Sequence, residues 1–231
     1  MSAASPIDSD GRHGVSTQAV LFDLDGTFAD TAPDLGHALN VLLEARDKPK
    51  MPLERIRQVA SSGARGLLGL GFDLAPGDAG YDALAAEFLD LYEQRLCSDT
   101  RLFPGIPELL QALEERGLPW GIVTNKAERF TLPLMRLLEL DRRARCVVCG
   151  DSTPYRKPHP QPLLTAAQTI GVAPAACIYL GDDERDMIAG RAAGMRVAVA
   201  EYGYLGTGNP PATWPADIWV AHPLQLMASL T

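Results

Sequence analysis

Short apolar runs alternate with amphipathic stretches along most of the chain. Each run ends at a polar residue or a glycine, which is typical of a strand that leads into a loop. The predicted strands are residues 18–23, 120–125, 145–148, 177–180, 196–200 and 218–220. The predicted helices are residues 107–116, 128–139, 160–170, 184–193 and 223–230. This alternation predicts an α/β fold in which a Rossmann-like, doubly wound parallel sheet carries helices on both faces.

One region breaks this pattern. Residues 31–100 contain no convincing strand, and their apolar spacing predicts helices at 35–43, 53–60, 65–70 and 81–96, with a loop at 73–80. A helical block after the first strand predicts a cap domain inserted into the sheet domain. The expected organisation is a disordered leader (1–17), an α/β core (18–30 and 101–231) and the helical cap (31–100).

Composition narrows the possible partners. The formal net charge is −8, and an acidic chain is poorly suited to non-specific binding of nucleic acid or anionic membranes. The N-terminus lacks the apolar segment of a signal peptide, and the sequence lacks an apolar run long enough to span a bilayer. We therefore expect a cytoplasmic protein with neither a nucleic-acid nor a membrane partner.

Cysteine usage offers one alternative chemistry. Cys146 and Cys149 have C-x-x-C spacing, which occurs in redox and zinc sites. Since no second pair of metal-binding residues follows and the surrounding run is apolar, we interpret both as core residues of a buried strand.

Acidic residues follow the first predicted strand. Asp23 and Asp25 are separated by one residue and followed by Gly26 and Thr27. Ligands of open parallel sheets bind at the carboxyl ends of the strands, where one carboxylate can attack a substrate and the other can transfer protons. The motif alone is also compatible with an acidic turn or a calcium loop.

Two further elements could bind an anion. Thr124 and Asn125 end the strand at 120–125 and precede a helix, where a hydroxyl and backbone N–H groups can hold a phosphate; the simpler interpretation is a helix N-cap. Lys157 lies ahead of the helix at 160–170, and its ammonium could neutralise both a nucleophilic carboxylate and a phosphoryl group.

A second acidic cluster follows the strand at 177–180. Asp182, Asp183, Glu184 and Asp186 would repel a nearby acidic pair unless a cation lay between them, and oxygen ligands alone suit Mg²⁺. A charged helix N-terminus would also explain Glu184, but it explains Asp182 poorly.

Together the motifs D-L-D-G-T, T-N, K-P and G-D-D-x-x-D, in this order, resemble the haloacid dehalogenase superfamily of phosphohydrolases. The resemblance covers about residues 18–226. The inserted helical region is similar to the cap of the subgroup that contains phosphoglycolate phosphatase. Local stretches, including those at 30–34, 62–65 and 202–204, resemble a branch labelled phosphoglycolate phosphatase, which also includes N-acetylmuramic acid 6-phosphate phosphatase; the pattern does not separate the two.

The resemblance implies a role for each motif. Asp23 would form an aspartyl phosphate, and Asp25 would act as acid and then base. Mg²⁺ would be held by the Asp23 carboxylate, the Asp25 backbone carbonyl and Asp182. The resemblance also implies that Asp186 supports the metal and that Thr124, the Asn125 backbone and Lys157 hold the phosphoryl group; Thr27 offers a further hydroxyl, and the role of Asp183 stays open.

The expected substrate is a small phosphorylated metabolite. Phosphoglycolate is the first candidate and N-acetylmuramic acid 6-phosphate the alternative; both carry a carboxylate, which Arg65 beside Gly63 in the cap could bind. Asp25 disfavours a dehalogenase, because halide needs no proton. A sugar-phosphate mutase and a non-catalytic phosphate-binding protein are less favoured rivals. We expect a monomer or a homodimer.

Overall fold

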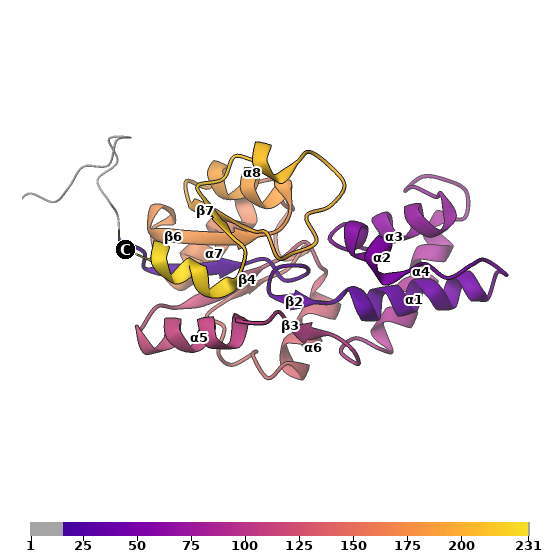
Figure 1. The fold of residues 1–231 in the computed structure, drawn as a ribbon, viewed down its shortest axis with the longest axis horizontal. Helices are drawn as coiled ribbons and strands as arrows, with labels where there is room; N and C mark the ends of the chain where they lie inside the picture. The colour runs from indigo at the N-terminus through magenta and orange to yellow at the C-terminus, as the bar shows by residue number, and fades with distance from the viewer. Residues whose placement is uncertain (1–15, 231) are drawn as a thin grey trace, which may run out of the picture.

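The computed structural model describes residues 16–230, and Figure 1 shows them as two lobes joined by two chain crossings. The predicted leader lies almost entirely within residues 1–15, outside the described residues. Among residues 16–230, no helix has both the length and the apolar character needed to span a membrane.

The larger lobe is built on a parallel sheet. Within residues 16–230 this sheet has six strands in the order β5-β4-β1-β6-β7-β8. β1 lies between β4 and β6, so Val20 is opposite both Trp120 and Ile178. The chain therefore crosses to one side and later to the other side of β1, which creates a crevice at its carboxyl end. The strands are β1 (Ala19–Phe22), β4 (Trp120–Val123), β5 (Val147–Val148), β6 (Cys177–Gly181), β7 (Arg196–Ala200) and β8 (Ile218–Val220).

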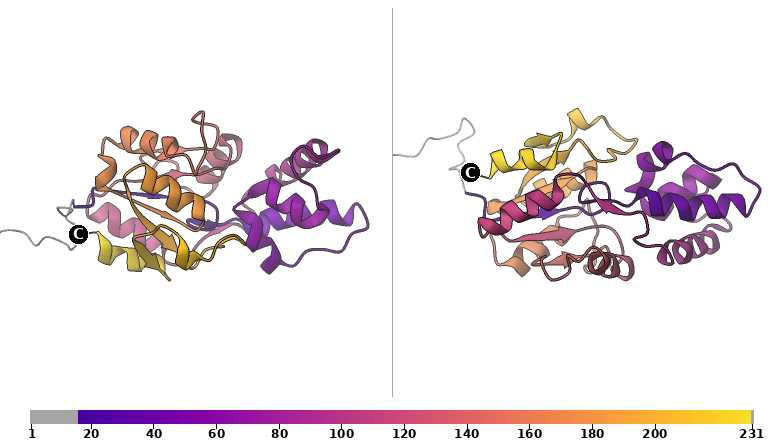
Figure 2. Two further views of the ribbon diagram at one scale, coloured as in Figure 1. Left: turned by 90° about the horizontal axis from the view of Figure 1, so that it is seen from above. Right: turned by 60° about the horizontal axis from the view of Figure 1, so that its bottom comes forward.

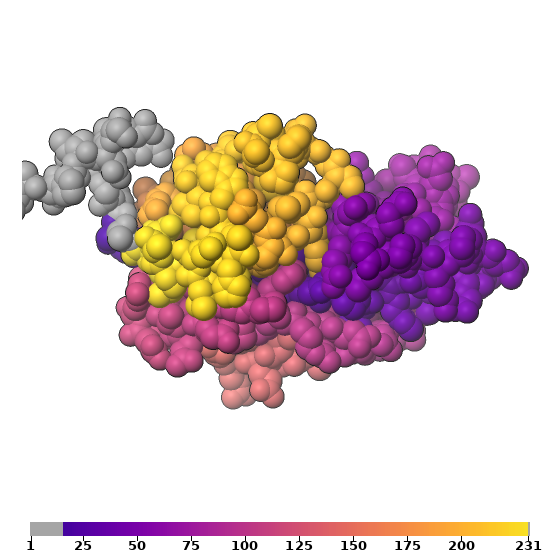
Figure 3. All heavy atoms as spheres, viewed as in Figure 1, coloured from indigo at the N-terminus to yellow at the C-terminus, as the bar shows by residue number. Residues whose placement is uncertain are grey.

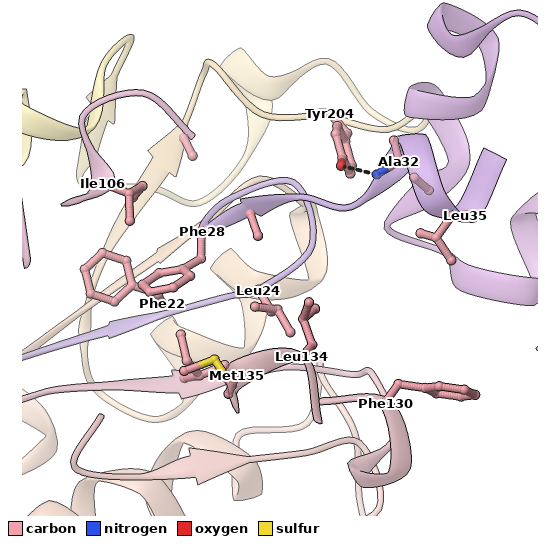
Figure 4. Close-up of a cluster of buried hydrophobic side chains, with 14 of the residues drawn as sticks. Phe22, Leu24, Phe28, Ala32, Leu35, Ile106, Phe130, Leu134, Met135 and Tyr204 are labelled. Atoms are coloured by element: carbon pink, nitrogen blue, oxygen red, sulfur yellow. Dashed lines mark hydrogen bonds between the residues drawn. The ribbon is translucent and has the colours of Figure 1, made fainter. Parts of the chain in front are cut away.

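Helices cover both faces because successive strand residues point to opposite sides. Val20 and Phe22 pack into the apolar cluster that includes α5 (Ile106–Glu115) and α6 (Glu128–Leu137). Ala19 and Leu21 pack into the cluster that includes α7 (Gln161–Ile170) and α8 (Glu184–Ala192). Figure 4 shows the first face, where the rings of Phe22 and Phe28 meet edge to face with centroids 5.5 Å apart. This double coverage explains why the strands are apolar throughout.

The smaller lobe is the inserted helical region, at the right of Figures 1 and 2. In the space-filling view of Figure 3 it stands beside the core, and the last residues of the chain, in yellow, lie on the core. Its helices are α1 (Ala32–Glu44), α2 (Leu53–Ala60), α3 (Gly63–Phe72) and α4 (Tyr81–Glu93). Short strands β2 (Ala29–Asp30) and β3 (Arg101–Leu102) pair antiparallel where the chain enters and leaves this lobe.

A tyrosine of the core fastens the entry to this lobe. The hydroxyl of Tyr204 accepts a hydrogen bond from the backbone N–H of Ala32 (2.9 Å, Figure 4) and donates one to Asp30 (2.7 Å). Asp30 also pairs with Arg57 of α2 at 2.6 Å. One side chain of the sheet lobe thus holds the first residues of the cap.

The predicted fold class is confirmed, with differences at element ends. The segment predicted as a last helix, 223–230, is instead a 3₁₀ helix, η3 (Pro223–Ser229). Its buried residues, Pro223 and Leu226, are three apart, the spacing that a 3₁₀ turn aligns. Further 3₁₀ turns are η1 (Pro174–Ala176) and η2 (Pro211–Thr213), and the strand pair β2–β3 has no counterpart in the sequence prediction. The exact boundaries of cap and core stay a prediction.

Candidate active site

A buried lysine connects two carboxylates at the carboxyl edge of the sheet. Asp23 directly follows β1, and Lys157 Nζ donates to its Oδ1 at 2.8 Å. The same ammonium lies 2.7 Å from Asp186 Oδ1 and donates to the backbone oxygen of Val123 at 3.0 Å. The hydroxyl of Tyr179 lies 2.7 Å away. Burial opposes the charge of Lys157, but Asp186 and Asp23 outweigh it and raise its pKa above the usual value, so the ammonium stays protonated.

A third carboxylate completes the acidic cluster. Asp182 is fully buried, and its oxygens accept from the hydroxyl of Thr27 (2.8 Å), from the Tyr204 backbone N–H (3.0 Å) and from the Ser61 hydroxyl (3.2 Å). One oxygen from each of Asp23, Asp182 and Asp186 lies within 4.8 Å of the others. Three carboxylates this close, without other donor types, form the oxygen-rich set that a hard divalent cation prefers.

Gathering these carboxylates away from water disfavours their charged forms. Burial, opposed by Lys157 and reinforced by Asp186, raises the pKa of Asp23 from 3.8 to about 7. Burial and the neighbouring Asp23 and Asp186 raise the pKa of Asp182 well above its usual range. A bound cation would remove this penalty. The residues therefore fit a divalent metal ion, although they do not identify which one.

The loop after β6 orients Asp186. Asp183 is the N-cap of α8 and accepts from the Arg185 backbone N–H at 2.9 Å, while the side chain of Asp186 accepts from the Asp183 backbone N–H at 3.1 Å. Arg185 also pairs with Asp183 and donates to the backbone oxygen of Ser61 at 3.0 Å. The acidic cluster thus serves two purposes. Asp183 caps the N-terminus of α8, and the remaining carboxylates form a possible metal site.

Asp25 points to a different partner from Asp23. Its carboxylate is bound by Lys126 Nζ, at 2.9 and 3.3 Å, and by the hydroxyl of Thr31 at the entry to the cap. Gly26 makes the turn that follows, with φ +87°, and a Cβ there would overlap the Asp182 carboxylate. The predicted acid and the predicted nucleophile therefore lie in one loop but in separate hydrogen-bond networks.

Thr124 and Asn125 organise the neighbouring loops. The hydroxyl of Thr124 accepts from the Lys126 backbone N–H at 3.1 Å. The amide of Asn125 pairs reciprocally with the backbone of Lys157, donating to its oxygen at 3.0 Å and accepting from its N–H at 2.9 Å. The Asn125 side chain thus fixes the loop that carries the buried lysine.

A cavity of about 650 Å³ opens over this cluster, between the two lobes. Its sheet side is formed by Asp23, Asp25, Thr124, Asn125, Lys126, Lys157 and Asp186. Its cap side includes Gly63, which has φ +57°, and the exposed Arg65. The cavity thus combines most of the predicted site residues, while Thr27 and Asp182 are fully buried and bonded to each other.

Several residues of the site were not singled out from the sequence. Lys126 binds Asp25, and Tyr179 and Arg185 hold the acidic cluster. Ser61 and Tyr92 approach from the cap. Only Lys126 had a signal, since it directly follows Thr124-Asn125. The alternative site at Cys146 and Cys149 is far less suited to chemistry: both are buried, and burial raises the pKa of the Cys146 thiol to about 12.

A comparison of the chain with models of protein families leads to the same kind of enzyme as the geometry of the site. The model of the haloacid dehalogenase-like hydrolases matches residues 20–200. The chain belongs to this family. The expected enzyme class, a phosphatase-type hydrolase, agrees with the relatives that follow.

The relatives divide between two substrates. The chain is 42% identical over 210 residues to N-acetylmuramic acid 6-phosphate phosphatase of Pseudomonas aeruginosa. The match covers 91% of this chain and 93% of that relative. It is 44% identical over 209 residues to phosphoglycolate phosphatase of Xanthomonas campestris, covering 90% and 94%. A crystal structure described as a predicted phosphoglycolate phosphatase from Haemophilus somnus superposes with a TM-score of 0.82 at 26% identity, over 93% of this chain and 98% of that chain.

Proposed function

We propose that this family member hydrolyses the phosphomonoester of a small carboxylated metabolite through an aspartyl phosphate on Asp23. The observation that carries the proposal is the convergence of Asp23, Asp182 and Asp186 with the buried ammonium of Lys157 at one edge of the sheet. Lys157 neutralises the attacking carboxylate. The carboxylate attacks phosphorus, and the bond from phosphorus to the leaving oxygen breaks.

Asp25 supplies the proton that this step requires. It lies two residues after the nucleophile and lines the same cavity, so it can give its proton to the leaving oxygen and then take one from the water that cleaves the acyl phosphate. Thr124, the Asn125 backbone and Lys157 would hold the phosphoryl oxygens as charge moves between them.

Asp23, the Asp25 backbone carbonyl and Asp182 would hold Mg²⁺, with Asp186 in support. The raised pKa values of Asp23 and Asp182 support a cation at this place. When bound, the ion would neutralise phosphoryl charge and the carboxylates around it. Thr27 would act through Asp182, whose carboxylate it orients, rather than by touching the substrate.

Two substrates are candidates. Phosphoglycolate is the first candidate, although the sequence pattern does not separate the two, and Arg65 at the cap side of the cavity would bind its carboxylate. N-acetylmuramic acid 6-phosphate is favoured by one specific observation, the size and lining of the cavity. A volume of about 650 Å³ with Phe88, Leu89 and Phe130 in its wall exceeds what a two-carbon acid fills, and a substituted sugar would use it better.

The test is a phosphate-release panel with the Mg²⁺-loaded protein. Phosphoglycolate, N-acetylmuramic acid 6-phosphate and several sugar phosphates are compared by kcat/KM, and product isomers are assayed in parallel. We expect free phosphate and a clear preference for a carboxylated substrate. Isomerised product without free phosphate would indicate a mutase, and no turnover of any phosphate ester would reject the proposal. A cytoplasmic location and a monomeric or homodimeric state stay predictions.

A further inference from the structure

The ammonium of Lys126 lies between the predicted acid and an aromatic ring of the cap. Its Nζ binds both oxygens of Asp25, at 2.9 and 3.3 Å, and lies 4.6 Å from the centroid of the Tyr92 ring. The side chains of Lys126 and Asp25 are 7% and 13% exposed, so water screens this ion pair only weakly. Lys126 comes from the loop after β4, whereas Tyr92 comes from α4 of the cap.

The backbone of Lys126 is held independently of this contact. Its N–H donates to the Thr124 hydroxyl at 3.1 Å, and its carbonyl oxygen accepts from the Gly150 N–H at 2.8 Å. Only the flexible stem of the side chain can therefore move the ammonium. With the base of the stem fixed, the position of the ammonium depends on the groups at its tip, which are Asp25 and the cap ring.

Tyr92 is firmly placed and uncharged. The residue is 1% exposed and its ring packs on Phe130 of α6, with ring centroids 5.5 Å apart. Burial raises the pKa of Tyr92 to about 12, so the phenol is neutral and offers the ammonium the face of its ring. Among residues 16–230 its hydroxyl has no hydrogen-bond partner. The ring face is thus the part of Tyr92 whose geometry shows a contact with the ammonium of Lys126.

We propose that Lys126 is a positioning residue for Asp25 and that the ring of Tyr92 seats it, so that placing α4 over the core also places the acid. The inference rests on the proposed function, because it assigns to Asp25 the proton transfer to the leaving oxygen. Lys126 fixes the direction of the Asp25 carboxylate, and the cap supplies the surface against which Lys126 is held. Without either partner, the Asp25 carboxyl group loses the contact that fixes its direction, while Asp23 and its partner Lys157 keep theirs.

Two leaving groups separate this role from a structural one. The value of kcat/KM reports the steps up to the breaking of the phosphorus–oxygen bond. The leaving oxygen of an alkyl phosphate such as phosphoglycolate needs a proton at that point. The p-nitrophenolate released from p-nitrophenyl phosphate, the aryl substrate, leaves without one. Loss of the positioning contact should therefore lower kcat/KM for the alkyl substrate and largely spare the aryl substrate. A Lys126 that bound the phosphoryl group directly would matter equally for both.

The experiment compares Lys126→Met, Tyr92→Leu and Tyr92→Phe. We expect the ratio of kcat/KM for the alkyl substrate to that for p-nitrophenyl phosphate to fall about a hundred-fold in Lys126→Met, because displacement of a catalytic group by about 1 Å costs this much. Tyr92→Leu should lower the same ratio in the same direction, and Tyr92→Phe should retain it because the ring face persists. Lys50→Met is the matched control, since Lys50 is an exposed cap lysine paired with Glu44.

Each outcome has one meaning. An unchanged ratio in Lys126→Met overturns the inference, whether both substrates slow equally or neither slows. It leaves the proposed phosphatase intact. A normal ratio in Tyr92→Leu removes the cap from the mechanism. If Lys126→Met does not fold, Lys126→Arg is measured in its place, because it keeps the charge but changes the geometry of its contact with Asp25. A wild-type protein that hydrolyses neither substrate defeats the proposed function itself.

Discussion

The two walls of the cavity are built in opposite ways. On the sheet side, Asp23, Lys157 and Asp186 are buried and bonded to one another within hydrogen-bond distance. On the cap side, Arg65 is exposed, and among the described residues no ion pair holds it. A rigid wall suits a reaction that is the same for every phosphate ester, and an exposed wall suits the part of the substrate that differs. Changes to the sheet wall should therefore abolish activity, while changes to the cap wall should alter preference.

The largest effect is expected from Asp23→Asn. The amide cannot attack phosphorus, so phosphate release should fall by about 10⁴-fold or more for every substrate. The fold should survive, because asparagine has the shape of aspartate and replaces a buried carboxyl group whose pKa is raised. Phosphate release and the far-UV circular dichroism spectrum check the two claims. Near-normal turnover would end the assignment of Asp23 as nucleophile.

Metal removal should have a comparable effect that is reversible. EDTA should stop phosphate release, and added Mg²⁺ should restore it, because the carboxylates of Asp23, Asp182 and Asp186 repel one another without a cation. Titration with Mg²⁺, Mn²⁺ and Ca²⁺ of the metal-free protein identifies the ion. The matched variant Asp182→Asn should need a higher Mg²⁺ concentration for half-maximal activity. Full activity after complete metal removal would refute the metal site.

The cap wall is tested by Arg65→Ala. Loss of a guanidinium contact to a substrate carboxylate should raise KM for the carboxylated substrate by about 10- to 100-fold, and KM for p-nitrophenyl phosphate should barely change. Arg55→Ala is the control, since Arg55 is an exposed arginine of α2 outside the cavity wall. Equal changes for both substrates would remove Arg65 from substrate recognition.

The two walls also differ in how far the sequence predicts them. Strand ends at Asp23, Thr124 and Asp182 follow from apolar runs that stop at polar residues, because parallel strands bring their carboxyl ends to one edge. The contacts of Lys126 and Tyr92 do not follow, since they join the loop after β4 to helix α4, which lies 34 residues earlier in the chain and approaches only through the packing of the cap. Only the tertiary structure shows that Lys126 turns to Asp25.

The same limit applies to small elements. The strand pair β2–β3 has two residues in each strand, too few for any periodicity to indicate it. Its position at both chain crossings is a consequence of where the inserted helices leave the core. The 3₁₀ helix η3 has seven residues, too few turns for a period of about 3.0 to be told from one of about 3.6 in the sequence.

The smallest effect concerns stability without metal. In the unfolded chain Asp23 loses its proton near pH 4, but in the folded protein burial raises its pKa to about 7. Between these values the folded state binds more protons than the unfolded state, so the free energy of unfolding falls as pH rises from about 4 to about 7. Asp182, whose pKa is also raised, adds to this trend.

Calorimetry of the EDTA-treated protein checks this sign. The Tm of the metal-free protein should fall steadily as pH rises across that window. The pKa of Asp183 is lowered, because Arg185 outweighs its burial, so its contribution is lost only below about pH 4 and does not disturb the window. Mg²⁺ competes with protons for the same oxygens, so its stabilising effect should grow with pH. Asp23→Asn should flatten the slope, and a metal-free Tm that rises toward pH 7 would mean that the sheet wall does not carry buried, mutually repelling carboxylates.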